Sequence, residues 1–194
     1  QQVPSNVKRC ADLGLAMVLG TTGWYDQTDK IKEVVEKAGI GLIWSGNFSL
    51  GVNLFFHMIK MAGEVMNRFE DYDVAVHEDH HRLKVDSPSG TAEMIGNILL
   101  GSLERKNAVV TGTLEGKIKE NSLHISSTRI GAVPRSHRVT FDSEVDSIVL
   151  EHSARSRAGF AEGAVRAAEW ISGRRGFYNI DDMMQSIIGG KENG

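Results

Sequence analysis

Short apolar runs alternate with amphipathic segments through the first fifty residues of the chain. Residues 15–19 and 41–44 are short and continuously apolar, which is typical of strands buried on both faces of a parallel sheet. Residues 26–38 place apolar side chains at helical spacing, and a helix that Ser5 is expected to cap precedes the first run. This alternation predicts a parallel sheet covered by helices, with ligands bound beyond the carboxyl ends of its strands.

The middle of the chain is predicted to hold two longer helices around one strand. Residues 49–69 form the longest helical pattern, and residues 91–103 form the second helix. Between them, residues 73–77 alternate as a strand that leads into a histidine-rich loop. Residues 107–116 predict a short strand and a turn.

The last third of the chain is richer in strand patterns. Three runs separated by turns are expected to pair antiparallel: residues 122–130, 136–141 and 146–152. Residues 158–171 form an amphipathic helix, and Asp181 is expected to cap a final helix at residues 182–188. The fold class is therefore α/β with an added α+β part, and we place the boundary near residues 47–51.

Composition excludes several classes of protein. The chain is 41% hydrophobic and 24% charged, with a formal net charge of -3 and interspersed basic residues, so it lacks the footprint of a nucleic-acid or anionic-membrane binder. No stretch approaches the ~20 apolar residues that a membrane span needs. Cys10 is the single cysteine, which excludes an internal disulfide and favours a cytoplasmic setting.

The densest group of chemically active residues lies between His77 and Ala92. His80, His81 and Lys84 stand just ahead of a Ser-Gly-Thr helix entry at residues 89–91. Histidine titrates nearest neutral pH, lysine supplies a charge or a proton, and a helix start offers free backbone N–H groups to a carboxylate. The pattern favours a small, multiply anionic substrate that accepts a proton. It disfavours a metal site, because the spacing lacks accompanying carboxylate or cysteine ligands.

Other polar residues have simpler interpretations. Asp86 is expected to order the loop or start the helix rather than act as an acid. Arg129, at the end of a strand, is either an ion-pair residue or a pocket wall. The histidines without a motif are interpreted as structural or exposed: His57, His124, His137 and His152.

The run His80–Ala92, HHRLKVDSPSGTA, resembles the signature of the 4-hydroxy-tetrahydrodipicolinate reductase family, also called dihydrodipicolinate reductase. Four further segments agree in order: GTTGW at 20–24, NFSLGVN at 47–53, RIGAVP at 129–134 and ARSRAGF at 154–160. The resemblance covers essentially the whole chain. It implies an oxidoreductase of lysine and diaminopimelate biosynthesis that uses NADH or NADPH to reduce the cyclic dehydration product of hydroxy-tetrahydrodipicolinate to tetrahydrodipicolinate.

The resemblance also implies roles for individual residues. His80 would be the proton donor or acceptor, and Lys84 a second proton donor. The carboxylates of a small dicarboxylate substrate would be held by His81, Lys84, Ser89, Gly90 and Thr91. The cofactor would be bound by Gly20, Thr21, Thr22, Ser45, Gly46, Asn47 and Phe48, with Arg157 and Phe160 as weaker candidates. No metal is implied.

The implied architecture has three parts. Residues 1–48 would be a partial, truncated Rossmann-like sheet, residues 49–177 a substrate-binding and oligomerisation domain, and residues 178–194 a helix returning to the first part. The family begins with a strand and a GxGxxG-type loop that seats the cofactor pyrophosphate. That fingerprint is absent here, and about the first seventy residues expected of the family are missing, consistent with a lost βαβ unit and its neighbour.

This departure leaves three functional hypotheses open. In the first hypothesis, the full protein carries the nucleotide loop and is an ordinary reductase, of which this chain is a shortened piece. Alternatively, it is a truncated form that keeps the dicarboxylate site and the oligomer interface, binds cofactor poorly, and is inactive or regulatory. In a third hypothesis the scaffold serves a non-enzymatic, small-molecule-binding oligomer.

We expect self-association in each case. The family suggests a tetramer. A half-built sheet exposed around residues 15–19 and 42–44 could add a dimer contact, because unpaired strand edges seek partners.

Overall fold

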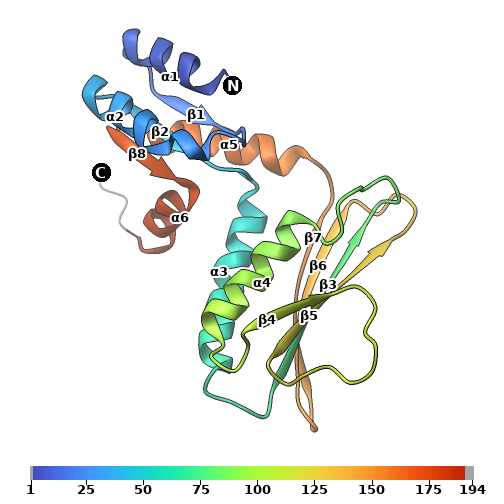
Figure 1. Cartoon of the computed structure of the whole chain (residues 1–194). Coiled ribbons are helices and arrows are strands. Elements are labelled where there is room, and N and C mark those ends of the chain that lie inside the picture. The colour runs from blue at the N-terminus through green and yellow to red at the C-terminus, as the bar shows by residue number, and fades with distance from the viewer. Residues whose placement is uncertain (1, 191–194) are drawn as a thin grey trace. The chain divides into compact units, whose positions relative to one another are not determined.

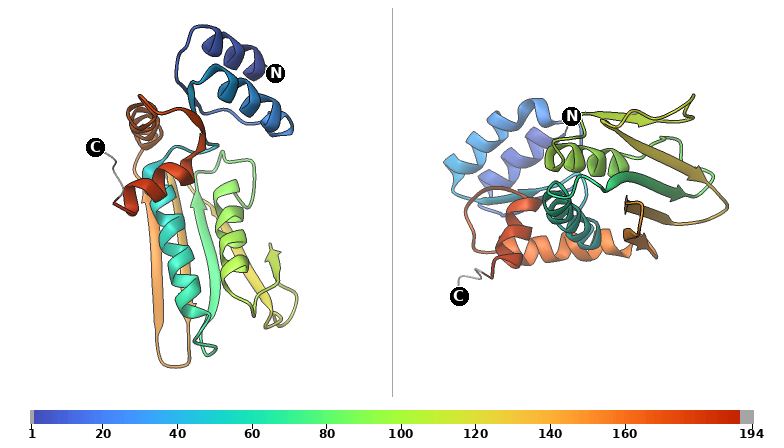
Figure 2. Two further views of the ribbon diagram at one scale, coloured as in Figure 1. Left: turned by 90° about the vertical axis from the view of Figure 1, so that its left-hand side faces the viewer. Right: turned by 90° about the horizontal axis from the view of Figure 1, so that it is seen from below.

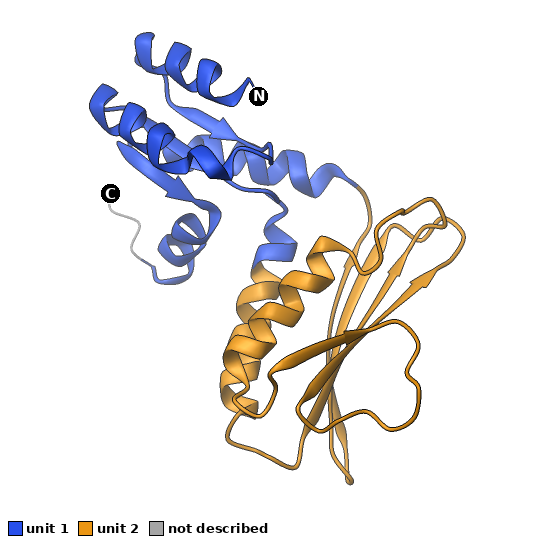
Figure 3. Cartoon of the chain, viewed as in Figure 1, with its two compact units in different colours: residues 1–53, 157–194 blue, residues 54–156 orange. Residues whose placement is uncertain are grey.

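The computed structural model describes residues 2–190, which divide into two compact units. Unit 1 comprises residues 1–53 and 157–194, and unit 2 comprises residues 54–156 (Figure 3). The sequence-based division placed residues 157–177 in the second part, whereas the structure groups them with unit 1. The reason is packing, since the helix at Ala158–Ile171 buries Ala167 and Ile171 against the small sheet of unit 1.

Unit 1 is built on a three-stranded parallel sheet in the order β1-β2-β8 (Figure 1). Its strands are β1 (Met17–Leu19), β2 (Gly41–Trp44) and β8 (Gly176–Asn179). Its helices are α1 (Val3–Asp12), η1 (Tyr25–Gln27), α2 (Thr28–Ala38), α5 (Ala158–Ile171) and α6 (Ile180–Ile188). Successive residues of β2 serve opposite faces: Leu42 packs in the core with α1 and α2, and Ile43 in the core with α5 and α6.

Three expectations for this unit were wrong in detail. Strand β8 was not predicted, and because it pairs with β2, the predicted exposed surface at residues 42–44 is interior, with Leu42 fully buried. The last helix is capped by Asn179 with Asp182 in a capping box, not by Asp181. Ser5 lies inside α1 and donates back to the carbonyl of Gln2 instead of capping the helix.

Unit 2 carries a five-stranded mixed sheet in the order β4-β5-β3-β6-β7. The strands are β3 (Asp73–His80), β4 (Ala108–Thr111), β5 (Ser122–Arg129), β6 (Arg135–Asp142) and β7 (Ser147–Ala154). Helices α3 (Leu50–Met66), which begins in unit 1, and α4 (Gly90–Ser102) pack on one face of this sheet (Figure 2). Among the described residues, no helix combines the length and apolarity needed to cross a membrane.

Strand pairing in unit 2 corrects one expectation and confirms another. β6 and β7 are antiparallel as predicted, but β5 pairs parallel with both β3 and β4. The reason is that β3 lies between β5 and β6 and pairs antiparallel only with β6. β3 also extends to His80, three residues beyond its expected end, so this histidine lies on a strand and not in a loop.

Candidate functional site

The end of β3 carries two polar side chains into an otherwise apolar core. Because strand side chains alternate, Glu78 and His80 continue the buried face that Val74 and Val76 begin. Their side chains are 0% and 1% exposed. A buried carboxylate needs partners for its charge, so the surroundings of Glu78 define this site.

One oxygen of Glu78 is fully engaged by hydrogen-bond donors. Oε1 accepts from the backbone N–H of Ser89 at 3.0 Å, from Oγ of Ser127 at 2.8 Å and from Nη2 of Arg129 at 3.0 Å. Burial opposes ionisation, but the donors around the carboxylate, His137 first among them, outweigh it and hold the pKa of Glu78 well below its ordinary value. Glu78 is therefore an anion at neutral pH.

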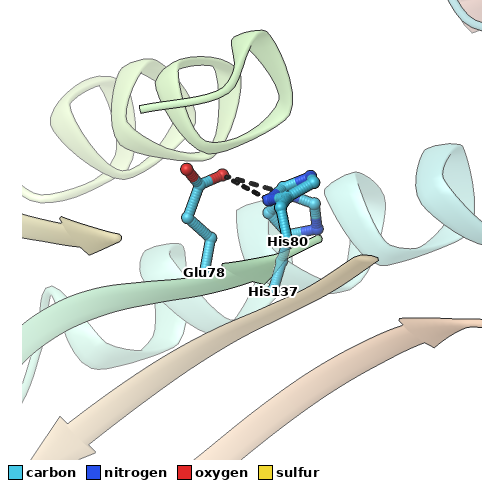
Figure 4. Close-up of side chains that lie close together, drawn as sticks. All are labelled: Glu78, His80 and His137. Atoms are coloured by element: carbon cyan, nitrogen blue, oxygen red, sulfur yellow. Dashed lines mark ion pairs between the residues drawn. The ribbon is translucent and has the colours of Figure 1, made fainter. Parts of the chain in front are cut away.

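The other oxygen of Glu78 faces two imidazoles. Oε2 lies 3.4 Å from Nδ1 of His80 and 3.5 Å from Nε2 of His137, and both rings meet the same oxygen (Figure 4). The ring centroids are 5.3 Å apart in an edge-to-face arrangement. Burial lowers the pKa of His80 to about 4, and the charge of Glu78 only partly offsets that effect. His80 is thus neutral near pH 7.

The start of α4 adjoins this cluster. Ser89 is the N-cap, its Oγ accepts from the N–H of Ala92 at 3.2 Å, and the same Oγ lies 3.2 Å from Nε2 of His137. Gly90 and Thr91, the first two residues of the helix, have no recorded partner for their N–H groups among residues 2–190. A Cβ on Gly90 would meet nothing within 4 Å. The helix tip therefore offers two N–H donors without a partner among the described residues, and the space beside Gly90 is open, as an anion site requires.

The remaining residues of the predicted motif lie outside the buried cluster. The side chain of Lys84 is 22% exposed and forms an ion pair with Asp86, which agrees with the loop-ordering role expected for Asp86. His81 is half-buried, and no hydrogen bond of its side chain is recorded within residues 2–190. The charge of Lys84 nevertheless acts on His80 and contributes to lowering its pKa.

Arg129 closes the other side of the loop. Its guanidinium donates to the carboxylate of Glu78 and to the backbone carbonyl of Asp86. The first of the two sequence-based interpretations, an ion-pair residue, therefore describes its contacts. By binding both, Arg129 links the end of β5 to the loop that carries Lys84.

Glu78, His80 and His137 could each offer one atom to a metal ion, since their ligand atoms lie within 4.8 Å of one another. The carboxylate, however, already shares its charge with the guanidinium of Arg129 and two further donors. This arrangement fits a carboxylate held by its three donors and paired with two imidazoles better than a metal centre.

The predicted cofactor residues belong to unit 1, where two loops follow β1 and β2. Gly20, Thr21 and Thr22 are exposed after β1. The loops touch each other: the N–H of Ser45 donates to the carbonyl of Leu19 at 3.1 Å. A Cβ on Gly46 would lie 3.3 Å from the hydroxyl of Tyr25.

The second loop is held by its own hydrogen bonds. Oγ of Ser45 bonds the backbone of Asn47, and Asn53 donates to the carbonyl of Asn47 at 2.9 Å. Phe48 is buried against Gly20. These bonds fix the loop while leaving Gly46 exposed. Gly46 and residues 20–22 are therefore exposed at the carboxyl ends of β1 and β2, whereas Ser45 and Phe48 are buried.

The start of α5 approaches the same loop. A Cβ at Gly163 would overlap the backbone carbonyl oxygen of Phe48, so only glycine allows this contact. Arg157 occupies the N-cap position of α5, and Phe160 is half-buried in its first turn. The sequence-predicted cofactor segments therefore converge within unit 1.

A cavity of about 340 Å³ adjoins the cluster, because Ser127, which donates to Glu78, is among its mainly hydroxyl-bearing lining residues. Its lining comprises Ser87, Pro88, Thr111, Gly112, Thr113, Ile125, Ser126 and Ser127. None of the residues predicted for catalysis or substrate binding lines it, and it holds no charged side chain.

Sequence reasoning missed Glu78 and did not place His137 beside it. The alternation of β3 contained a signal for Glu78, because a strand extended by three residues puts a carboxylate on the core face. His137 lies 48 positions after Ser89 in the sequence and reaches His80 only through the β3–β6 pairing, in which Glu78 lies opposite His137. Nothing local in the sequence marks that contact.

Comparisons with known proteins point to one family. The family profile "Dihydrodipicolinate reductase, N-terminus" matches residues 1–48, and "Dihydrodipicolinate reductase, C-terminus" matches residues 51–184. A 4-hydroxy-tetrahydrodipicolinate reductase of Christiangramia forsetii is 37% identical over 183 residues, which are 94% of this chain and 75% of the relative. One of Neisseria meningitidis serogroup B is 37% identical over 185 residues, 92% of this chain and 67% of the relative.

A solved structure supports the fold. The dipicolinate-bound dihydrodipicolinate reductase from Paenisporosarcina sp. TG-14 has a TM-score of 0.73 and 23% identity, covering 93% of this chain and 69% of that one. The expected fold class, a parallel sheet with an added mixed-sheet part, is confirmed.

Proposed function

The chain belongs to the dihydrodipicolinate reductase family, and we propose that unit 2 supplies the dicarboxylate site and proton-transfer groups of this oxidoreductase. The observation that carries the proposal is the open tip of α4 next to the Glu78–His80 pair. The reaction adds one hydride and one proton to an unsaturated ring dicarboxylate in the pathway to lysine and diaminopimelate.

Substrate carboxylates would bind at the tip of α4 and at the cationic loop before it. The N–H groups of Gly90 and Thr91 would hold one carboxylate, with the Ser89 cap keeping the helix start rigid. Lys84 and His81 would hold the other, since a partly exposed ammonium can exchange Asp86 for a substrate anion.

The proton would come from Lys84, with His80 as the adjacent acceptor. Because burial lowers its pKa, His80 is neutral near pH 7, so it would take up a proton only transiently and pass it on to the substrate ring. Lys84 carries the positive charge beside it.

The loops of unit 1 would bind the dihydronicotinamide cofactor, NADH or NADPH. When bound, this cofactor supplies the hydride. The exposed backbone around Gly46 and Thr21 fits a flat ring laid across the two loops, because a side chain at Gly46 would fill that space. The residues that would choose between NADH and NADPH are not among the predicted set.

A second possibility is a chain that binds dicarboxylate without turnover. It is favoured by one observation: the polar cluster beside the tip of α4 is complete within unit 2 alone.

An assay separates the two. The chain is mixed with freshly formed substrate and either NADH or NADPH, and loss of reduced cofactor is followed by absorbance. Turnover supports the reductase. Saturable binding of pyridine-2,6-dicarboxylate in a calorimeter without turnover supports the second possibility, and absence of both contradicts the site.

The protein is further proposed to be a cytoplasmic homo-oligomer, a tetramer or a dimer. The lone Cys10 suits a reducing compartment. β7 forms one edge of its sheet and exposes Ile148 and Val149, which suits association. Light scattering on a sizing column tests this, and a monomer at micromolar concentration would contradict it.

A further inference from the structure

Glu78 has no role in the assignments above, yet it organises the cluster around His80. Three donors from α4 and β5 hold its Oε1 at 2.8–3.0 Å, so the carboxylate cannot rotate freely. Oε2 is therefore fixed in direction, and it is directed at the two imidazoles (Figure 4).

We propose that Glu78 is a positioning residue that holds His80 in the tautomer with hydrogen on Nδ1, leaving Nε2 as the nitrogen that takes part in proton transfer. This inference rests on the proposed function of His80. A bare Nδ1 lone pair would face a carboxylate oxygen 3.4 Å away inside the core, which is repulsive, whereas an N–H there is attracted. The separation is longer than a tight hydrogen bond, as is common for catalytic contacts without ligand.

The same geometry prepares His80 to hold a proton transiently. A proton gained at Nε2 leaves a buried imidazolium facing the Glu78 anion, so the charge that forms is stabilised where water is excluded. The other charged or titratable groups that act on His80 are His137, Arg129 and Lys84, and each of them disfavours the imidazolium. Glu78 is the one attractive partner among them.

The hydroxyl-lined cavity at Ser126 and Thr111 holds no charged group that would select a ligand. Glu78, His80 and His137 could together receive a metal ion, but the ion pair of Glu78 with Arg129 opposes this. Addition of Zn²⁺ during the NMR measurement distinguishes a metal site from a positioning role of Glu78.

The test is the tautomer of His80, read from ¹⁵N NMR of its imidazole at neutral pH, with the signal assigned through His80→Asn. In the unaltered protein we expect hydrogen on Nδ1 and a bare Nε2. In Glu78→Gln the amide oxygen can keep the Oε1 contacts while its NH₂ faces Nδ1, so the tautomer should invert. The matched control Ser126→Ala changes a hydroxyl on the opposite face of β5, bonded to His77, and should leave the tautomer as it is.

Turnover gives a second readout. Glu78→Gln should lower kcat by about 10²–10⁴-fold, the range for losing an oriented acid–base group, while KM changes by less than about threefold. The pH at which kcat falls should also move. A merely structural role would lower the amount of folded protein without inverting the tautomer.

Several results would overturn the proposal. They are hydrogen on Nε2 in the unaltered protein, an unchanged tautomer in Glu78→Gln, or Zn²⁺ shifting the His80 and His137 signals at stoichiometric amounts. If Glu78→Gln does not fold, the measurement on the unaltered protein still decides. The NMR measurement needs neither substrate nor cofactor, so the two proposals can fail separately. An unexpected tautomer in a protein that turns over substrate rejects the positioning role alone. The expected tautomer in a protein without turnover rejects the proposed function alone.

Discussion

The two units present their candidate residues in opposite ways. In unit 2 the ionisable groups are buried and partnered, with Glu78, His80 and His137 at 2% exposure or less. In unit 1 the candidate surface is made of exposed backbone and small side chains around Gly20 and Gly46, anchored by the buried Phe48.

This difference indicates that unit 2 contributes charged and proton-transfer groups, whereas unit 1 contributes a surface that a ligand can approach closely. A buried carboxylate sets charge and tautomer before any ligand arrives, because a low-dielectric site strengthens each electrostatic contact. An exposed loop of glycines and hydroxyls contributes little charge and mainly allows close approach. We therefore expect substitutions in the buried cluster of unit 2 to change stability and pH dependence, and those on the exposed loops of unit 1 to change binding alone.

The largest effect is expected from Glu78→Leu. It leaves Arg129 and two further donors without their buried acceptor, which costs ~3–5 kcal/mol of unfolding free energy. Denaturant unfolding of this variant measures the loss. The control is Glu151→Leu, since Glu151 is paired with Arg138 at the surface and should cost no more than ~1 kcal/mol. Equal losses of unfolding free energy in the two variants would show that the buried contacts of Glu78 stabilise the fold no more than a surface ion pair does.

A fall in pH should destabilise the protein already above the pH at which ordinary carboxylates become protonated. The pKa of His80 is lowered from 6.5 to about 4 in the folded state, so the unfolded chain binds the proton more readily between these values. The stabilisation is complete above pH 6.5 and is lost as the pH falls toward 4, on the order of 3 kcal/mol. Below that range, protonation of Glu78 removes more.

Thermal unfolding across that pH range checks the sign. In His80→Asn, the unfolding temperature should depend less steeply on pH between 6.5 and 4. A slope that is unchanged in this variant would assign the effect to another group, such as His152, whose pKa is also lowered by burial.

Lys84→Met should weaken dicarboxylate binding by ~1.5–3 kcal/mol, the value of a charge-assisted hydrogen bond. Stability should hardly change, because the ion pair with Asp86 is at the surface and a methionine keeps the apolar stem. Calorimetric titration with pyridine-2,6-dicarboxylate measures this. Lys117→Met, which alters an exposed lysine of the same unit, is the control, and equal weakening would point to general charge attraction.

Gly90→Ala should separate folding from binding at the tip of α4. The new methyl group meets nothing within 4 Å, and alanine suits a helix better, so stability should hold or rise by ~0.5–1 kcal/mol. Binding of the dicarboxylate should weaken because the methyl group occupies the space beside the free N–H. Undiminished affinity would place the ligand away from Gly90.

The smallest effect on stability is expected in unit 1. Gly46→Ala brings a methyl group 3.3 Å from the hydroxyl end of Tyr25, which can move, so unfolding should change by less than ~0.5 kcal/mol. Affinity for NADH or NADPH, measured by fluorescence, should fall. A large loss of stability would contradict the contrast between the two units.

The sequence predicted what local patterns can encode. The helices, the strands of the first sheet except β8, and the Ser89 helix start follow from apolar spacing and capping chemistry. It could not predict that β3 would separate β5 from β6, because parallel pairing over a long crossover leaves no local mark. For the same reason, the Glu78–His137 contact, made across paired strands, was missing from the predicted site.

Amide NMR during titration with pyridine-2,6-dicarboxylate tests whether the tip of α4 beside the Glu78–His80 pair receives a dicarboxylate. We expect the N–H signals of Gly90 and Thr91 to shift saturably, together with those of the loop at Lys84, and the shifts to vanish in Lys84→Met at the same ligand concentration. Saturable binding that leaves the signals of Gly90 and Thr91 unmoved would contradict it.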